Sequence, residues 1–487
     1  MKFTGAGMIN KRVILRARRD DLLMILHLRI TTIIAAFLIT PSLHAELPGQ
    51  GPRLGHDRID QAQIESGTMG LKEIRGAGLK VFSTPFNKLD GYGDGPMNPS
   101  NSRDPGGRPT LGDNGTFLRV NGLDGQSCLE CHSIISNASV PAKFGIGGVG
   151  GSVSNAIFQP TLIDVSDDLN LNHAAMDGRF INPPFLFGSG GVELIAKEMT
   201  TDLQGLKDFA VQNPATPVQL ETKGINFGVL VYDGVDFDYT GVEGIDTDLV
   251  VRPFGRKGEF PTVRAFDQGA MMFHFGMQPI ELVGKDVDDD GDGVVNEMLI
   301  GELSALAIFN TTLERPQRDK SPQSAAQGIR LFRTVGCVMC HRPTLISNGQ
   351  VLSYSFPEVA NDPSVNIYYN VNLATSTSGF RVAKSGGIEV PLFADLKRHD
   401  MGPGLAEFVG HPLDSQFTTA RLWGVADTAP YMHDGRALTL NDAILMHGGE
   451  AQPARNRYAR LAEKDQATLL EFLLSLRTPK TPAADLE

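Results

Sequence analysis

Two short motifs contain every cysteine of the chain. Residues 128–132 read Cys-Leu-Glu-Cys-His, and residues 337–341 read Cys-Val-Met-Cys-His. In a C-x-x-C-H motif the two thiols reach the two vinyl groups of one porphyrin, and the adjacent imidazole falls under the iron as the proximal ligand. The pattern predicts two covalently bound haems c, with the following attachment cysteines and proximal ligands: Cys128, Cys131 and His132 for the first, and Cys337, Cys340 and His341 for the second.

Two other kinds of chemistry use paired cysteines. A zinc site would need the two pairs to converge, although Cys131 and Cys337 lie far apart in the sequence. A dithiol redox motif does not need the histidine. Four cysteines in 487 residues are also too few for a disulfide scaffold. Haem attachment therefore accounts for the residues better than either alternative.

A second set of ligand-type residues lies between the two cysteine motifs. Residues 286–297 fit the calcium-loop pattern D-x-D-x-D-G-x5-E. Carboxylates at alternate positions point inward in a tight turn, Gly291 permits the bend, and the final glutamate can bind the ion through both oxygens. We therefore expect Ca²⁺ on Asp286, Asp288, Asp290, Asp292 and Glu297; the alternative is a solvated acidic turn.

A weak internal repeat indicates which elements position the haem motifs. Residues 78–84 (GLKVFST) resemble residues 328–334 (GIRLFRT), and each copy predicts a helix that precedes a cysteine motif. In the first copy the spacer 85–127 is rich in Gly, Pro, Asn and Asp, so we expect a long loop inserted before Cys128. Two unrelated amphipathic helices are the alternative interpretation.

Two further elements can be predicted from periodicity. Residues 459–477 place several leucines on one helical face, as in the C-terminal helix that crosses the N-terminal helix of a c-type cytochrome. Residues 224–244 alternate apolar and polar positions between glycines, which predicts a small hairpin. The expected fold is mainly α, with two cytochrome c-like haem domains and long loop insertions in the first.

The N-terminus predicts where the protein is located, and the overall charge excludes one class of partner. Residues 1–45 combine basic residues, an apolar stretch at 30–40 and a small residue before Glu46, which predicts a cleaved signal peptide and a periplasmic location; an uncleaved anchor helix is the alternative. Beyond it no apolar run is long enough to span a membrane. The formal net charge of -12 argues against nucleic-acid binding.

The second half resembles the bacterial dihaem cytochrome c peroxidase superfamily, in particular its dihaem oxidoreductase branch. Residues 417–440 (FTTARLWGVADTAPYMHDGRALTL) carry the superfamily pattern T-A-P-Y-x-H-D-G, and residues 399–406 (HDMGPGLA) and 447–451 (HGGEA) resemble the branch. In the first half the resemblance covers the haem motif, residues 182–193 and parts of 254–277. As a family, dihaem peroxidases also bind calcium at the junction of the haem units.

The resemblance implies a distal ligand for the C-terminal haem. In dihaem peroxidases the residue fourteen positions after the histidine of the Y-x-H-D-G motif is a methionine that binds the electron-transfer haem. Here that count leads from His433 to His447, which implies an iron with two histidine ligands and a lower potential than a His/Met iron. Met401 and Met446 are the fallback ligands, and His433 is expected to be a structural residue near the haem.

The resemblance also points to catalytic candidates at the N-terminal haem. Peroxide must lose one proton and gain another during O–O cleavage, so an acid–base group beside the iron accelerates the reaction. Glu193 follows the turn 188–191, where the family supplies distal residues, and Glu198 is its rival. For the distal ligand we consider His173 and, in a separate segment, His274 with Met272 and Met277.

One residue departs from the family pattern. Dihaem peroxidases usually place a tryptophan from the first domain between the haems, whereas the single tryptophan of this chain, Trp423, lies in the second half. Either Trp423 relays electrons, or other aromatic residues do, or the haems exchange electrons directly. A core aromatic role is the simplest alternative for its large side chain.

These observations predict an exported dihaem c-type oxidoreductase that is peroxidase-like, with one electron-transfer haem and one haem that binds the oxidant. The expected organisation is a signal peptide at 1–45, an N-terminal haem domain at 46–284, a calcium loop and connecting helix at 285–321, and a C-terminal haem domain at 322–487. The expected partners are a small redox donor protein, such as a cytochrome or a cupredoxin, and a small oxidant such as peroxide. The alternative function is an electron-transfer cytochrome that serves a periplasmic dehydrogenase.

Overall fold

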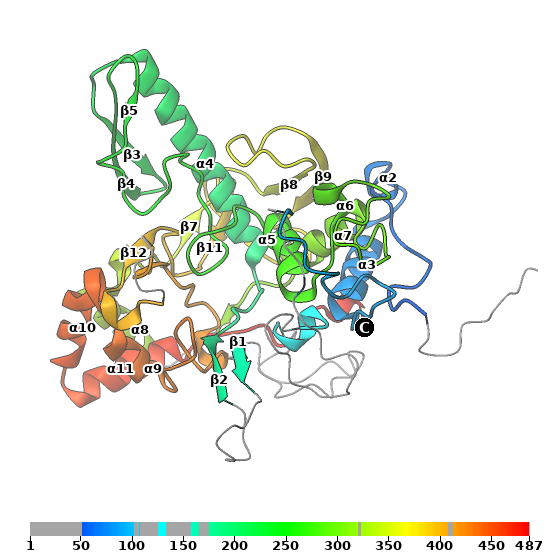
Figure 1. Ribbon diagram of the computed structural model, residues 1–487. Coiled ribbons are helices and arrows are strands. Elements are labelled where there is room, and N and C mark those ends of the chain that lie inside the picture. The colour runs from blue at the N-terminus through cyan, green and yellow to red at the C-terminus, as the bar shows by residue number, and fades with distance from the viewer. Residues whose placement is uncertain are drawn as a thin grey trace, which may run out of the picture. The chain divides into compact units, whose positions relative to one another are not determined.

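The computed structural model describes residues 51–101, 107, 125–132, 157–164, 175–319, 323–407 and 413–486 (Figure 1). Apart from Gly51, these residues belong to one compact unit, Pro52–Glu487. The predicted signal peptide and the candidate ligand His173 lie outside the described residues.

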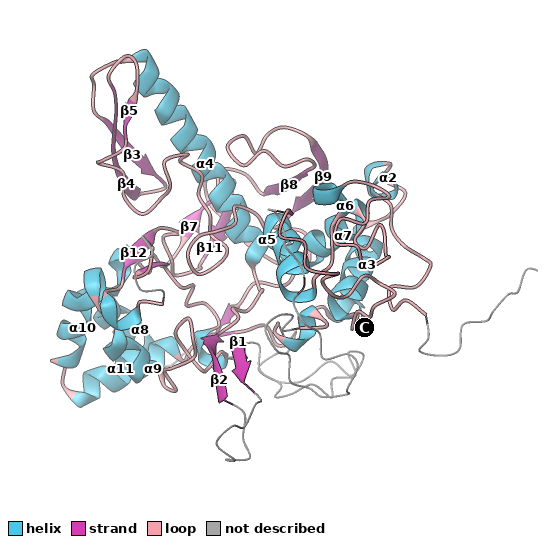
Figure 2. Cartoon of the chain, viewed as in Figure 1, coloured by secondary structure: helices cyan, strands magenta, loops and turns pink. Residues whose placement is uncertain are grey.

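The fold is mixed, so the expectation of a mainly α protein was wrong. The structure is 35% helical and 14% strand, and the strands of the described residues form six small antiparallel sheets (Figure 2). Residues 218–222 and 225–232 pair across a short turn, because two antiparallel segments need only a tight turn to pair, whereas residues 317–318 pair with the distant residues 476–477. The predicted hairpin at 224–244 is confirmed by the pairing of Val231 with Asp238 and of Tyr232 with Phe237.

The first helix pair consists of α3 (Leu71–Ser83) and α7 (Ile300–Thr311). A Cβ atom added to Gly78 of α3 would lie 2.5 Å from Cβ of Phe309 in α7, so the glycine allows the two backbones to approach closely. The rings of Phe82 and Phe309 pack beside this point with centroids 5.5 Å apart. The short helices α2 (Gln61–Glu65), α5 (Val263–Ala270) and α6 (Ile280–Val283) are the other α-helices around this pair.

The second helix pair repeats the first. Helices α8 (Gln323–Thr334) and α11 (Glu463–Leu473) cross where a Cβ atom on Gly328 would lie 2.5 Å from Cβ of Phe472. The rings of Phe332 and Phe472 are again 5.5 Å apart. The glycine and the phenylalanine of the sequence repeat therefore make the same contacts in both copies. Helices α9 (Leu440–Met446) and α10 (Gln452–Ala459) complete this part of the fold.

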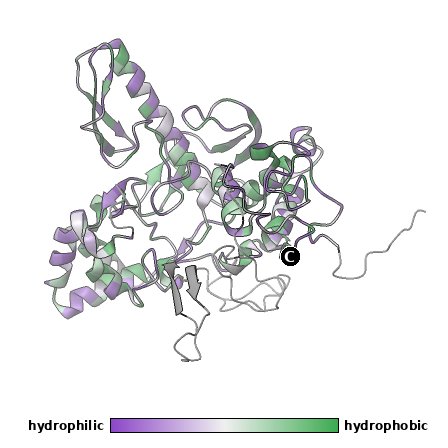
Figure 3. Ribbon diagram, viewed as in Figure 1, coloured by the Kyte–Doolittle hydropathy of each residue, from purple (hydrophilic) through white to green (hydrophobic). Residues whose placement is uncertain are grey.

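The long helix α4 (Ser189–Gln212) leads from the helix pairs to a three-stranded sheet. The sheet consists of β3 (Val218–Thr222), β4 (Ile225–Tyr232) and β5 (Phe237–Asp238), and Figure 1 shows it beside the C-terminal end of α4. Hydrophobic and hydrophilic residues alternate along α4 (Figure 3), as expected for a helix with one buried face.

The remaining strands are short. They are β1 (Ile157–Asp164) with β2 (Ala175–Ile181), β8 (Val351–Ser355) with β9 (Ile367–Asn372), β12 (Arg398–Asp400) with β13 (Gln416–Thr418), β14 (Leu476–Arg477) with β6 (Gln317–Arg318), and the sheet of β10 (Arg381–Val382), β11 (Ile388–Val390) and β7 (Leu345–Ile346). Single helical turns occur at Cys128–Glu130, Cys337–Met339, Pro403–Leu405, Val425–Asp427, Gly449–Ala451 and Ala484–Leu486, and Met271–Phe275 forms a π-helix. Among the described residues, every helix is too short or too polar to cross a bilayer.

Candidate haem and calcium sites

Both cysteine motifs have the same local structure. Each begins with a single helical turn, and the backbone N–H of the motif histidine donates to the carbonyl of the first cysteine, at 2.8 Å for His132 and 2.9 Å for His341. This turn brings both cysteines and the histidine of each motif to one end of the preceding helix. The arrangement follows from the motif spacing and suits the attachment of one porphyrin.

The two motif histidines are oriented by the same kind of hydrogen bond. Nδ1 of His132 lies 2.9 Å from the carbonyl oxygen of Pro184, and Nδ1 of His341 lies 3.0 Å from that of Phe393. In both cases the carbonyl belongs to the residue 52 positions after the histidine. A carbonyl can only accept, so each Nδ1 carries the proton and each Nε2 keeps the lone pair that a haem iron needs.

Burial keeps both motif histidines neutral. It lowers the pKa of His132 to about 4, and it lowers the pKa of His341 to about 4 with a contribution from the charge of His447. A neutral imidazole with a fixed tautomer is the form that binds a metal. Both side chains are therefore prepared to act as axial ligands.

His447 faces His341 at a distance that suits an iron between them. The two ring centroids are 6.4 Å apart. Two metal–nitrogen bonds of about 2 Å, plus the half-width of each ring, require about 6.3 Å. Nδ1 of His447 lies 2.7 Å from the carbonyl oxygen of Ala443, which again leaves Nε2 for the metal. The fallback ligand Met446 lies next to it but is 38% exposed.

An unpaired cation supports the presence of an anionic cofactor. The side chain of Arg421 is partly buried, desolvation lowers its pKa to about 10, and its guanidinium lies over the ring of Phe254. Among the described residues no carboxylate pairs with it. A partly buried cation without a carboxylate partner can accommodate an anion, and haem propionates are carboxylates of the kind that arginine binds. The residues present therefore fit a haem.

Residues 420–424 contact both segments that orient the motif histidines. The backbone N–H of Leu422 donates to the carbonyl of Leu392 at 3.1 Å, beside the carbonyl of Phe393 that orients His341. On the other side, a Cβ atom on Gly188 would lie 2.7 Å from the indole ring of Trp423. Trp423 is 2% exposed, and its Nε1 has no hydrogen-bond partner among the described residues. The only tryptophan thus packs close to the segment that orients His132.

Glu193 belongs to a buried network of charged residues. Its carboxylate pairs with Lys197 at 2.7 Å and accepts the backbone N–H of Val263 at 2.9 Å. Val263 begins α5, and Phe266 of the same helix packs edge-on against the ring of His132. If His132 is the proximal ligand, as its motif predicts, this contact would place α5 on the proximal side of the first haem.

Glu198 has a different environment. Its carboxylate pairs with Lys223 at 2.7 Å and accepts the backbone N–H groups of Asn348 and Gly349. These contacts fix a turn of the second half against α4. The structure therefore does not bring Glu193 and Glu198 to a common site.

The segment around His274 lies near the first haem motif. The charge of His274 contributes to the lowered pKa of His132, after the larger effect of burial. His274 belongs to the π-helix Met271–Phe275, in which the wider turn redirects side chains. The following Met277 is fully buried. Among the described candidates for the distal side of the first haem, His274 is therefore favoured by its electrostatic effect on the pKa of His132.

The predicted calcium loop brings three of its five residues together. The carboxylates of Asp288, Asp290 and Asp292 lie within 4.8 Å of one another. Asp286 instead pairs with Asn296, whose side-chain amide donates to it at 2.8 Å. Glu297 is 1% exposed, and one of its oxygens accepts the backbone N–H of Gln278 at 2.7 Å.

Electrostatics in this loop favour a cation. Burial, followed by the charge of Asp292, raises the pKa of Asp290 to about 7, and burial raises the pKa of Glu297 to about 9 with contributions from the three aspartates. Carboxylates that repel one another in this way are stabilised by a divalent cation. The loop also touches the first haem unit, because the backbone N–H of Gly95 donates to Asp290 at 3.0 Å.

Several functional contacts could not be found by sequence reasoning. The carbonyls of Pro184 and Phe393 orient the motif histidines, but a backbone carbonyl leaves no residue-type signal. Arg421 also escaped notice, because nothing in the local sequence distinguishes it from a surface charge. A comparison of the residues 52 positions after each motif histidine could have suggested the carbonyl contacts.

The structure contains two motifs whose geometry suits haem, and sequence comparison shows which family a part of the chain matches. Residues 301–476 match the model described as "Di-haem oxidoreductase, putative peroxidase", so this part of the chain is similar to that family. The match includes the second cysteine motif and the segments around His399, Trp423 and His447.

Two curated relatives are named as peroxidases. The chain is 31% identical over 201 residues to cytochrome-c peroxidase IdrP2 of Pseudomonas sp. (strain SCT), covering 39% of this chain and 50% of the relative. It is 27% identical over 173 residues to cytochrome-c peroxidase IdrP1 of Denitromonas iodatirespirans, covering 32% and 42%. The chain thus spans about half the length of the curated relatives that it matches.

A solved structure of hydrazine synthase from Kuenenia stuttgartiensis is also similar to part of the chain. It is 18% identical, with a TM-score of 0.22, and the similarity covers 36% of this chain and 55% of that one. The similarity to the dihaem oxidoreductase family is therefore carried by the sequence matches.

Proposed function

We propose that the protein is an exported dihaem c-type oxidoreductase with peroxidase-like activity. In this proposal the C-terminal haem transfers electrons, and the N-terminal haem binds a small oxidant such as peroxide. The observation that carries the proposal is the matching orientation of His132 and His341, each held by a carbonyl 52 residues farther along the chain. Haem iron, when bound, would supply the one-electron redox chemistry.

The C-terminal site suits electron transfer. His341 and His447 offer Nε2 from opposite sides at a spacing that fits one metal, so the iron would be closed to other ligands. Two imidazole ligands also give a lower potential than histidine with methionine. Arg421, which is partly buried, would pair with a haem propionate.

The N-terminal site must handle protons as well as electrons. Reduction of one peroxide consumes two electrons and two protons and releases two water molecules, so a side chain must move a proton between the two oxygens. We assign this role to His274, because Glu193 is engaged by Lys197 and Val263 beside the proximal helix α5. Glu193 would then act through the proximal side, and Glu198 would be structural.

Calcium and export complete the proposal. Asp288, Asp290, Asp292 and Glu297 would bind Ca²⁺ next to residues 91–95, and so would stabilise the loop that precedes the first haem motif. Residues 1–45 would direct export to the periplasm, where haem c proteins meet small soluble electron donors. The negative charge of the chain favours a donor with a basic surface.

The electrostatic effect of His274 on His132 also supports a second function. If His274 bound the first iron permanently, both haems would be closed, and the protein would be an electron-transfer cytochrome for a periplasmic dehydrogenase. Electron paramagnetic resonance separates the two functions. A high-spin ferric haem in the oxidised or half-reduced protein is expected for the enzyme, whereas low-spin haems in every redox state would establish the carrier.

The catalytic assignment is tested by rapid mixing of the half-reduced protein with peroxide. We expect His274→Ala to slow peroxide reduction by a factor of about 10²–10⁴, the usual contribution of a general acid–base group. Glu198→Gln should leave the rate unchanged. A large loss in Glu193→Gln with a normal rate in His274→Ala would transfer the role to Glu193.

A further inference from the structure

Two residues that the proposed chemistry does not use, His399 and Glu450, contact each other in the structure. His399 lies in β12, and Glu450 lies three residues after His447. Nδ1 of His399 is 2.7 Å from Oε2 of Glu450, and the backbone N–H of Asp400 donates to Oε1 at 2.9 Å. Both oxygens of Glu450 therefore bind β12, so the turn that follows His447 is attached to this strand.

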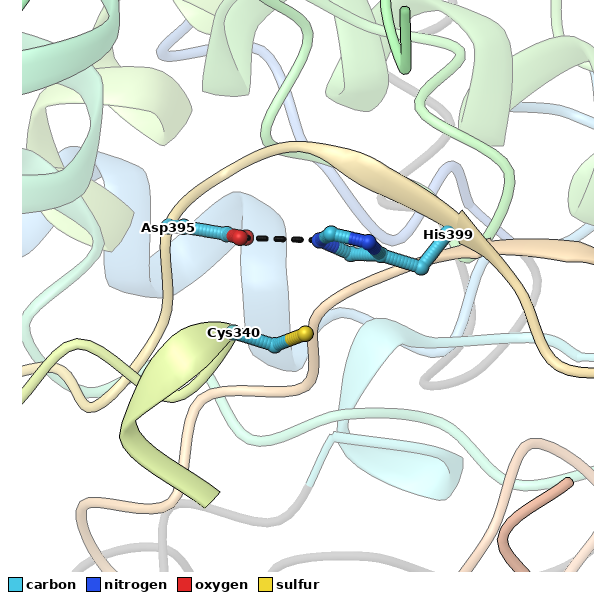
Figure 4. Close-up of side chains that lie close together, drawn as sticks. All are labelled: Cys340, Asp395 and His399. Carbon is cyan, nitrogen blue, oxygen red and sulfur yellow. Dashed lines mark hydrogen bonds and ion pairs between the residues drawn. The ribbon is translucent and has the colours of Figure 1, made fainter. Parts of the chain in front are cut away.

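The other side of His399 contacts the segment that orients His341. Nε2 of His399 is 2.8 Å from Oδ2 of Asp395, which is 2% exposed (Figure 4). The second oxygen of Asp395 accepts from the hydroxyl of Thr419 at 2.7 Å. Asp395 is two residues from Phe393, whose carbonyl accepts from Nδ1 of His341. His399 thus connects the proximal segment to the distal turn.

The charges of the three residues strengthen these contacts. Burial lowers the pKa of His399, but the hydrogen bonds to Asp395 and Cys340 and the charges of these two residues together outweigh burial and raise the pKa to about 11. The backbones also lie close together, because a Cβ atom on Gly402 would be 2.9 Å from the nitrogen of Gly449. Gly449 itself has a positive φ of 49°, so the turn after His447 depends on its glycines.

A metal site is a weaker explanation of the same residues. The ligand atoms of Cys340, Asp395 and His399 lie within 4.8 Å of one another. However, both ring nitrogens of His399 are already hydrogen-bonded to carboxylates, so neither lone pair is available. Cys340 would be a thioether after haem attachment and would no longer offer a thiolate.

We propose that Asp395, His399 and Glu450 form a clasp that keeps His447 bound at the sixth position of the C-terminal haem. His399 is a positioning residue in this arrangement, because it acts on the iron only through the His447 turn. The clasp rests on the proposed function, since that function assigns His447 as the distal ligand. Its role is to keep the electron-transfer haem closed to small ligands.

The test uses the full-length, haem-loaded protein and measures how fast cyanide binds to the C-terminal haem. Cyanide can enter only when His447 leaves, so its binding rate reports the opening of the clasp. We expect His399→Leu to bind cyanide at least tenfold faster than the unchanged protein. Glu450→Gln, at a side chain that is 54% exposed, should give a smaller increase. The matched control His56→Leu should leave the rate unchanged.

The possible outcomes separate the clasp from the ligand assignment. If His447→Gly leaves the low-spin spectrum of the C-terminal haem intact, the ligand assignment fails. If His447→Gly opens the haem but His399→Leu and Glu450→Gln bind cyanide at the normal rate, the clasp is overturned and the proposed function stands. If His399→Leu does not fold, Glu450→Gln decides alone. Unfolding midpoints of the same samples must stay equal, because a rate that rises only with general destabilisation also contradicts the clasp.

Discussion

Gly78 and Gly76 lie in the same helix and provide a matched test of the first helix pair. An alanine in a helix interior normally stabilises a protein by about 1 kcal/mol relative to glycine. A Cβ atom on Gly76 has no neighbour within 4 Å, so Gly76→Ala should give this gain. On Gly78 the same atom would be 2.5 Å from Cβ of Phe309 and under 3.0 Å from the carbonyl oxygen of Ala305.

The magnitude follows from these distances. Carbon atoms pack best at about 3.5–4.0 Å, so α3 and α7 would have to separate by about 1 Å. Overpacking of a well-packed core costs about 1–3 kcal/mol. The atoms in the way cannot rotate aside, so we take about 3 kcal/mol and subtract the propensity gain of about 1 kcal/mol. Gly78→Ala should therefore lower the free energy of unfolding by about 2 kcal/mol.

The assay is guanidinium unfolding of the haem-loaded variants, followed by haem absorbance and circular dichroism. The two midpoints should move in opposite directions, with a difference of about 3 kcal/mol in the free energy of unfolding. Equal shifts of the same sign would show that α3 and α7 do not approach closely. In that case α7 would be only a connecting helix and not part of the first haem unit.

Two further predictions concern the charged sites. Burial raises the pKa of Glu297 to about 9, so this carboxyl group is protonated in the ion-free loop at neutral pH. Ca²⁺ binding should therefore release protons, and the affinity for Ca²⁺ should increase as the pH rises from 6 to 9. Titration calorimetry in two buffers measures this release, and a pH-independent affinity would show that Glu297 is not a ligand. Arg421→Leu should lower the reduction potential of one haem, because the positive charge that favours the ferrous form is removed; each tenfold change in the ferric/ferrous ratio corresponds to about 59 mV. An unchanged potential in a redox titration would mean that Arg421 does not face a propionate.

The haem motifs could be predicted from sequence because their chemistry is local. Cys337, Cys340 and His341 lie within five residues, and their spacing alone positions one porphyrin. The same holds for α11, whose leucines repeat at helical intervals and whose Phe472 packs against Phe332 as expected for a C-terminal cytochrome helix. Short-range patterns of this kind survive in any tertiary context.

The remaining features depend on contacts between distant residues. Helix α7 is buried on nearly every side, so it lacks the one-sided pattern that would have identified it as the partner of α3. The calcium loop was predicted as a set of five ligands, but Asn296 pairs with Asp286 and removes it from the cluster. The short strands also left no clear signal, because pairs such as β6 with β14 contain only two residues each.

The haem content of the purified protein tests the central claim most directly. The pyridine haemochrome assay should return two haems per chain, and one haem in the double variants Cys128→Ser/Cys131→Ser and Cys337→Ser/Cys340→Ser. Denaturing mass spectrometry should show the same haems retained on the polypeptide. A chain that carries fewer than two haems, or that holds zinc on its cysteines instead, would contradict the account.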